Sequence, residues 1–273
     1  MATQPARSGS TVRRRPRRQN IRHLVIFLSF LAFPVTINFL SPYLIIQASF
    51  EGVLAGSGLA FLGLFVSSIF LGRLFCGWLC PGGGLNDILT GVNSRRVTGR
   101  WLRRIKILIW VVWLASLAGG FISSGGLRQI NPLYLTESGI SVDEPLKFII
   151  YYGVILIFLL ISVLVGRRAS CHAICWMAPF MMLGTKLGDR LGLPRLHIAS
   201  SAAGCISCER CVRQCPMSIG VREKLGPELA KHSDCCLCGE CVDICPKGCL
   251  KYRFGQVGQI GRPDSAGRRD QQD

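Results

Sequence analysis

Eight cysteines between residues 205 and 245 have the spacing of a redox cofactor site. They form two copies of C-x2-C-x2-C-x3-C-P, each ending in a Cys-Pro pair. Three cysteines on a tight loop can each reach one iron of a [4Fe–4S] cubane, and in this bacterial ferredoxin spacing the fourth ligates the other cluster. We therefore predict two clusters. Their ligands would be Cys205, Cys208, Cys211 and Cys245 for the first, and Cys235, Cys238, Cys241 and Cys215 for the second.

Zinc ribbons and a disulfide framework are the alternative interpretations of these cysteines. Zinc needs two C-x2-C knuckles and uses neither the third cysteine nor the prolines. Disulfides would require an oxidising compartment. Cys236 and Cys249 fall outside the spacing, and we interpret them as buried small side chains because free cysteine is often buried.

Two further cysteine pairs, Cys76 with Cys80 and Cys171 with Cys175, each occur in the pattern R-x2-C-x3-C. This spacing puts two thiols one turn apart on a helix. Arg73 and Arg168 begin the two patterns, and we expect their charges to lower the thiol pKa values. The pairs are candidate redox thiols, a soft-metal site or a partner contact. Structural packing at helix ends is the alternative.

Charge and hydropathy together indicate a membrane protein. The chain has 273 residues, 49% of them hydrophobic, and a formal net charge of +17. The basic residues gather before the first apolar run and in the loop at 95–106. Basic clusters that flank apolar spans follow the positive-inside rule, and they lack the stacking aromatics of single-strand binders. We therefore expect membrane lipid, and no nucleic acid, as a partner.

Four apolar runs have close to the 20 or so residues that a bilayer requires. They are Leu24–Ile46, Val53–Gly72, Ile107–Gly126 and Phe148–Gly166. The first contains Pro34 and Pro42, which predict a kink. The expected fold is an all-α polytopic membrane domain of four transmembrane helices in two hairpins, followed by a small α+β ferredoxin-like domain with two clusters.

The predicted topology follows from two independent distributions. The links between the spans of each hairpin are poor in positive charge, whereas the N-terminus, the 95–106 loop and the C-terminal region are basic. All fourteen cysteines lie at or beyond the basic ends of the spans, where a reducing compartment would protect them. We therefore expect a multi-pass protein of a prokaryotic cytoplasmic (inner) membrane, with both termini and the clusters cytoplasmic.

Composition shifts predict five segments. We expect a disordered basic N-terminus, a membrane domain, an interfacial linker broken at Pro194, the ferredoxin domain and a disordered tail. Their bounds are 1–23, 24–180, 181–203, 204–255 and 256–273.

The combination of four spans, two R-x2-C-x3-C elements and a C-terminal two-cluster module resembles the NapH-type family of membrane ferredoxins. The stretch from Phe75 to Pro81 and the two ferredoxin motifs carry the resemblance, which covers roughly residues 20–255. The resemblance implies electron transfer between membrane quinone, the clusters and a partner reductase, as a subunit of quinol-dehydrogenase type. In one departure from the family pattern, Trp176 rather than proline follows Cys175.

Three functional hypotheses remain open at this stage. The first is an electron-transfer protein linked to quinone, the second a copper reductase or assembly factor that uses the C-x3-C pairs, and the third a non-redox sensor or regulatory protein. No haem, flavin or NAD site is expected, because no C-x2-C-H or dinucleotide fingerprint is present. Candidate residues for a quinone site are Asn38, Arg73, Trp78 and Asp87. We also expect Arg210, Arg213 and Lys247, near the ligands, to favour the reduced clusters.

Overall fold

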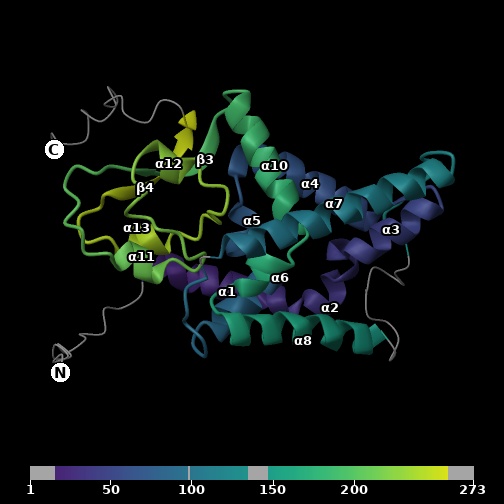
Figure 1. Cartoon of the computed structure of the whole chain (residues 1–273), viewed down its shortest axis with the longest axis horizontal. Helices are drawn as coiled ribbons and strands as arrows, with labels where there is room; N and C mark the ends of the chain where they lie inside the picture. Colours follow the sequence, from purple (N-terminus) through teal and green to yellow (C-terminus); the bar gives the residue numbers. More distant parts are fainter. Residues whose placement is uncertain (1–15, 98, 135–146, 258–273) are drawn as a thin grey trace.

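The computed structural model describes residues 16–97, 99–134 and 147–257. It is an elongated molecule in which long helices lie at one end and the cysteine-rich region at the other (Figure 1). The expected disordered tail from 256 lies almost wholly outside the described residues. The helices and strands of the N-terminal half are α1 (Arg17–Leu31), α2 (Phe33–Thr36), the 3-10 helix η1 (Asn38–Leu40), α3 (Pro42–Phe50), β1 (Val53–Ala55), α4 (Gly56–Leu71), α5 (Leu74–Trp78), α6 (Pro81–Leu89) and α7 (Arg100–Ser123).

The C-terminal half holds the remaining long helix and the cysteine-rich region. Its elements are β2 (Gln129–Asn131), α8 (Lys147–Val165), α9 (Ala169–Ala173), α10 (Met177–Arg190), β3 (Arg195–Ser200), α11 (Arg210–Gln214), α12 (Pro227–Ala230), α13 (Glu240–Ile244) and β4 (Leu250–Gly255).

The first apolar run is broken where the prolines predict. Helix α1 ends at Leu31, and α2 and α3 each begin with a proline in the first turn, at Pro34 and Pro42. Proline lacks the N–H that a helix interior needs, but it fits a first turn. At the other end, α1 already begins at Arg17, and Gln19 and Arg22 are buried. Residues 17–23 are therefore helical, not disordered as the sequence analysis expects, because they pack against the cysteine-rich region.

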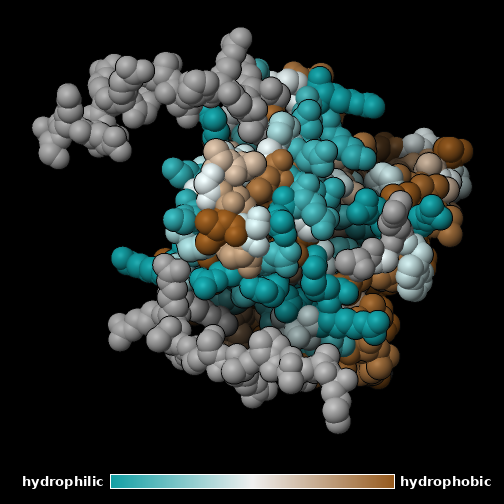
Figure 2. Space-filling view, turned by 60° about the vertical axis from the view of Figure 1, so that its left-hand side comes forward, coloured by the Kyte–Doolittle hydropathy of each residue, from teal (hydrophilic) through white to brown (hydrophobic). Residues whose placement is uncertain are grey.

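Two helices are long and apolar enough to cross a bilayer, over Trp101–Ser123 and Phe148–Val165. Helix α4 is also apolar but has 16 residues. Helix α10 packs along α4, with Gly184 at the closest approach, where an added Cβ would lie 2.6 Å from the Phe65 carbonyl oxygen. Figure 2, with the cysteine-rich end turned forward, shows hydrophilic side chains over much of this face and hydrophobic ones towards the right-hand side.

Two short strands pair where none was expected: β1 occupies the first three residues of the predicted second span, and β2 lies in the link between the third and fourth spans. Strand β1 pairs in parallel with β2, so that Leu54 lies opposite Ile130. The link after α3 is thereby joined to the link after α7. This pairing joins the outer ends of the two predicted hairpins, and residues this distant in sequence leave no local signal of it.

The segment 181–203, predicted as an interfacial linker, instead belongs partly to the helices and partly to the cysteine-rich region. Its first half belongs to α10, which has Met181 and Thr185 among its buried residues. Its second half is β3, which pairs antiparallel with β4 so that His197 lies opposite Arg253. The sequence break at Pro194 is real, but it separates a packed helix from a strand.

Candidate iron–sulfur and thiol site

The cysteines of the first predicted set surround one cavity. Cys205, Cys208, Cys211 and Cys245 all line it, although Cys245 belongs to the second copy of the motif. Arg210 and Lys247 also line this cavity, and Arg213 donates to the Cys208 carbonyl oxygen at 2.9 Å. The three basic residues expected near ligands therefore all lie at this first set.

Backbone N–H groups point at two of these sulfurs. Burial would raise the pKa of Cys245, but the N–H groups of Cys249, Lys247 and Gly248 outweigh it, so the pKa is lowered. For Cys211 burial prevails and the pKa is raised, although the Val212 N–H acts against it. Hydrogen bonds of this kind stabilise the thiolate, which is the form that binds iron. Four thiols around one cavity, with N–H donors to sulfur, fit a [4Fe–4S] cluster.

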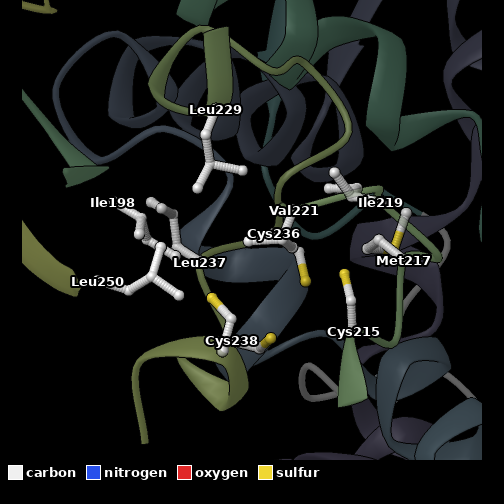
Figure 3. Close-up of a cluster of buried hydrophobic side chains, with 11 residues drawn as sticks. Ile198, Cys215, Met217, Ile219, Val221, Leu229, Cys236, Leu237, Cys238 and Leu250 are labelled. Carbon is white, nitrogen blue, oxygen red and sulfur yellow. The ribbon is translucent and has the colours of Figure 1, made fainter. Parts of the chain in front are cut away.

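The cysteines of the second predicted set lie together in the core of the cysteine-rich region. Cys215, Cys238 and Cys241 are buried there, and Cys235 packs against them. In Figure 3 the sulfur atoms of Cys215 and Cys238 lie in one interior region together with that of Cys236. Burial raises the pKa of Cys215 to about 11 and that of Cys235 to about 12. Such thiols would release protons on binding a metal cluster.

Cys236 has a role in this site that its spacing does not reveal. It is 2% exposed, as expected for a buried cysteine, and Arg168 Nη1 lies 3.5 Å from its sulfur. A hydrogen bond from Cys238, together with the charges of Arg168 and Arg73, lowers the pKa of Cys236 to about 6. Cys236 therefore links the second set to the arginine that begins the second R-x2-C-x3-C element.

A buried group of charges joins the helices to the second set. Asp87 accepts hydrogen bonds from Arg22 Nη1 and from Arg168 Nε, both at 2.9 Å. Arg22 also reaches Glu240 at 2.8 Å, and Arg168 donates to the Cys76 carbonyl oxygen at 3.2 Å. Burial would raise the pKa of Asp87, but the two arginines prevail and hold it below its ordinary value. The second cysteine copy is thus held by residues from α1, α6 and the start of α9.

The four cysteines of the R-x2-C-x3-C elements lie near one another. Cys76, Cys171 and Cys175 are all within electrostatic range of Cys80. Burial raises the pKa of Cys76 and of Cys80, and it raises that of Cys171 to about 12. The charges of Arg73 and Arg168 do lower the pKa values of Cys76 and Cys171, as expected, but the net shift of both thiols is upward. The loss of water around each thiolate costs more than these charges contribute.

A cavity of about 600 Å³ opens beside these thiols between the helices. Cys80, Cys171 and Cys175 line it, together with apolar and aromatic side chains such as Phe158 and Trp176. Asn38 also lines it. The other predicted quinone-site residues, Arg73, Trp78 and Asp87, instead contact or hold the second cysteine set: Arg73 and Trp78 donate to the carbonyl oxygens of Ser233 and Leu237.

Within the described residues, no three His, Cys, Asp or Glu side chains converge so as to hold a metal ion. This holds for the two predicted cluster sets as well as for the four thiols of the R-x2-C-x3-C elements, so it does not distinguish between them. Cys76 lies 3.5 Å from the thioether sulfur of Met181. The arginines around the second set were missed by the sequence analysis as contacts. For Arg73 and Arg168 the available signal was their position three residues before each C-x3-C, whereas Arg22 has no such position.

Comparison with known proteins agrees with this chemistry. The 4Fe-4S binding domain family matches residues 54–108 and 148–194, and the 4Fe-4S dicluster domain family matches residues 204–250. The chain is 26% identical to the putative electron transport protein YccM of Escherichia coli, over 75% of this chain and 57% of YccM.

Two ferredoxin-type proteins are similar over comparable lengths. The ferredoxin-type protein NapH of Haemophilus influenzae is 24% identical over 74% of this chain and 70% of its own length. The methylamine utilization ferredoxin-type protein MauN of Paracoccus denitrificans is 28% identical over 64% of this chain and 60% of its own. The chain thus spans little more than half of YccM. No solved structure matches it.

Proposed function

We propose that this chain is a ferredoxin-type iron–sulfur protein of the NapH type that passes electrons between a membrane quinone pool and a partner oxidoreductase; its similarity to NapH and MauN and the two 4Fe-4S family matches support this. We propose two [4Fe–4S] clusters as the carriers. The first would be held by Cys205, Cys208, Cys211 and Cys245, and the second by Cys235, Cys238, Cys241 and Cys215. The carrying observation is the single cavity lined by cysteines from both copies of the motif.

The residues around each cysteine set would bind the proposed clusters and tune their reduction. Bound clusters would each exchange one electron. The chain supplies thiolates and, at both sets, backbone N–H donors to sulfur. Positive charge stabilises the more negative, reduced form of a nearby group. Arg210 and Lys247 lie at the first set, and Arg168 lies beside Cys236 at the second.

We propose that quinol binds in the cavity beside Cys80, Cys171 and Cys175. The support is its volume of about 600 Å³, its mostly apolar lining and its few polar groups, which include Asn38. Ligand pockets of this size and character suit a lipophilic ring. Oxidation of one quinol to quinone releases two protons and two electrons, which matches the capacity of two one-electron carriers.

We further propose that all four apolar runs lie in the membrane, with both termini and the cysteine sets on the cytoplasmic side. The segregation of basic residues and cysteines supports this topology. It also fits the two long apolar helices and the shorter apolar α4. Where the first run is broken, side chains of neighbouring helices would supply hydrogen bonds to backbone carbonyl groups in the membrane. Trp113 Nε1, for example, donates to the Pro42 carbonyl oxygen.

The test is an assay of the purified, reconstituted protein in detergent. We expect about eight iron and eight sulfide per chain. A potential titration followed by electron paramagnetic resonance (EPR) should show two clusters, and a short-chain quinol should reduce them. A count of about four iron would contradict the second cluster. Clusters that dithionite reduces and quinol does not, at any quinol-to-quinone ratio, would contradict the coupling to quinone.

A further inference from the structure

The two copies of the cysteine motif have the same backbone and opposite surroundings. Ser207 and Leu237 occupy equivalent positions and share a left-handed backbone, with φ of 55° and 53°. Two residues further on, each copy is left-handed again, at Glu209 and Gly239. Yet Ile206 is 57% exposed, whereas its equivalent Cys236 is 2% exposed. The local sequence thus forms a similar loop twice, but residues 236–239 are all buried, whereas Ile206, Ser207 and Glu209 are exposed.

The cover on the second loop is the first R-x2-C-x3-C element. Gly77, between Cys76 and Cys80, lies so close that an added Cβ would be 2.2 Å from the Cys236 carbonyl oxygen and 3.2 Å from the Cys238 nitrogen. The next residue, Trp78, donates from Nε1 to the Leu237 carbonyl oxygen at 3.1 Å. The backbone that carries Cys76 and Cys80 thus touches the backbone that carries Cys235 and Cys238.

Further contacts fix this junction from both sides. Arg168 bonds both the Cys76 carbonyl oxygen and, at 3.5 Å, the Cys236 sulfur. From α1, Gln19 donates to the Cys238 carbonyl oxygen at 3.1 Å. Asp234, next to Cys235, is buried between Arg73 and Arg103 of two other elements. These hydrogen bonds and ion pairs, most of them between buried side chains, hold the two segments against each other.

These contacts put the sites in a row. Cys80, Cys171 and Cys175 line the apolar cavity. Cys76 packs against the core that contains the second set, and Gly77 touches the loop of that set. The first set lies on the exposed loop, with Ile206 and Lys247 at its surface.

We infer that the two cysteine sets act in a fixed order in electron transfer, an inference that rests on the proposed function. The second set exchanges electrons with the membrane region across the Gly77–Trp78 contact, and the first set exchanges them with the partner protein. The exposed loop at 205–211 is therefore the partner-facing site. Clusters held by the two sets would therefore act in series and not in parallel, with electrons passing from one set to the other.

Matched cysteine variants of the full-length, reconstituted protein test this order. Cys208→Ala and Cys238→Ala remove equivalent ligands from the first and second sets. Iron analysis and dithionite-reduced EPR spectra identify the cluster that each variant retains. With a short-chain quinol as reductant and rapid freezing, Cys208→Ala should show its remaining signal at the wild-type rate. Cys238→Ala should show its remaining signal with dithionite and lose it with quinol.

The opposite pattern, or equal reduction by quinol in both variants, would overturn the order. If quinol reduces neither cluster in the wild-type protein, the proposed coupling to quinone fails before the order is tested, and the two failures are distinguishable. In that case ferricyanide oxidation of the dithionite-reduced protein still decides: the first-set signal should disappear before the second, and the reverse sequence refutes the order.

A glycine pair provides a test that leaves every cysteine in place. Gly77→Ala must push the Cys236 loop away, whereas Gly63→Ala in α4 would have no atom within 4 Å of its new Cβ. Gly77→Ala should shift the EPR signal of the second cluster, leave that of the first unchanged and slow quinol reduction of both at least about tenfold, a barrier change of about 1.4 kcal/mol. Gly63→Ala should change none of these. Equal effects of the two variants, or a shift confined to the first cluster, would contradict the inference.

Discussion

Asp87→Asn should loosen the junction between the helices and the second cysteine set. The Asp87 side chain is 9% exposed, and it faces Arg22 and Arg168, which are 2% and 1% exposed. The amide is almost the same size as the carboxylate but carries no charge. The substitution therefore leaves two buried guanidiniums without their shared counter-charge and opens no large cavity.

The burial of these three side chains sets how strongly Asp87→Asn should destabilise the junction. Removing one partner of a buried ion pair costs about 3–5 kcal/mol, because the remaining charge is left uncompensated. Arg22 keeps Glu240 at 2.8 Å, so the lower end of that range is the safer expectation. At about 1.4 kcal/mol per tenfold, the open population of the junction should rise at least about a hundredfold.

Hydrogen exchange of the backbone amides at 236–239 measures this opening directly. The matched control is Glu228→Gln, which also converts a carboxylate into an amide. Glu228 is 74% exposed and lies 4.0 Å from Lys224, and a surface pair of this kind contributes about 0–1 kcal/mol. If Asp87→Asn accelerates exchange no more than Glu228→Gln does, the buried charges do not hold the junction and the reasoning is wrong.

Three further perturbations test other parts of the molecule. Gly184→Ala should lower the thermal midpoint by the equivalent of about 1–3 kcal/mol of overpacking, since its Cβ would lie 2.6 Å from the Phe65 carbonyl oxygen; Gly119→Ala, with no atom within 4 Å, should not lower it. Burial lowers the pKa of His172 to about 4 from an ordinary 6.5, so His172 is protonated in the unfolded chain first as pH falls. The free energy of unfolding should therefore decrease between pH 6.5 and 4 by up to about 1.4 kcal/mol per pH unit. Chemical denaturation at several pH values should show that His172→Gln flattens this slope. After removal of iron by a chelator, Cys208 should be alkylated at least about tenfold faster than Cys238, because the first loop is accessible without opening; mass spectrometry of the peptides gives both rates, and equal rates would contradict the difference in burial.

Local spacing predicted the cysteine sets but not their surroundings. The grouping of Cys245 with the first triplet follows from the motif alone, and in the structure these cysteines line one cavity. Which copy would be covered could not be predicted, because the cover comes from Gly77 and Gln19, more than a hundred residues earlier. The pairing of β1 with β2 was missed for the same reason, since it joins segments separated by several helices.

Charged residues were predicted least well, because their effect depends on burial. The arginines before each C-x3-C were expected to activate thiols, as an exposed cation would. In the structure the cost of burying a thiolate exceeds their effect at Cys76 and Cys171. The basic residues of 17–23 were interpreted only as a topology signal. Arg22 is in fact buried between Asp87 and Glu240, which no composition argument could indicate.

The two R-x2-C-x3-C elements differ at the position where the first element contacts the cysteine loop around Cys236. At the place of Gly77 in the first element, the second element has His172, and at the place of Trp78 it has Ala173. A side chain at the first position would collide with the Cys236 backbone, as the 2.2 Å approach at Gly77 requires. The second element therefore cannot take the place of the first against the cysteine loop. It contributes Arg168 instead, whose backbone is left-handed at φ 47° and whose guanidinium spans Asp87, Cys76 and Cys236. The internal repeat thus supplies two similar cysteine pairs, and divergence at one glycine decides which of them meets the second set.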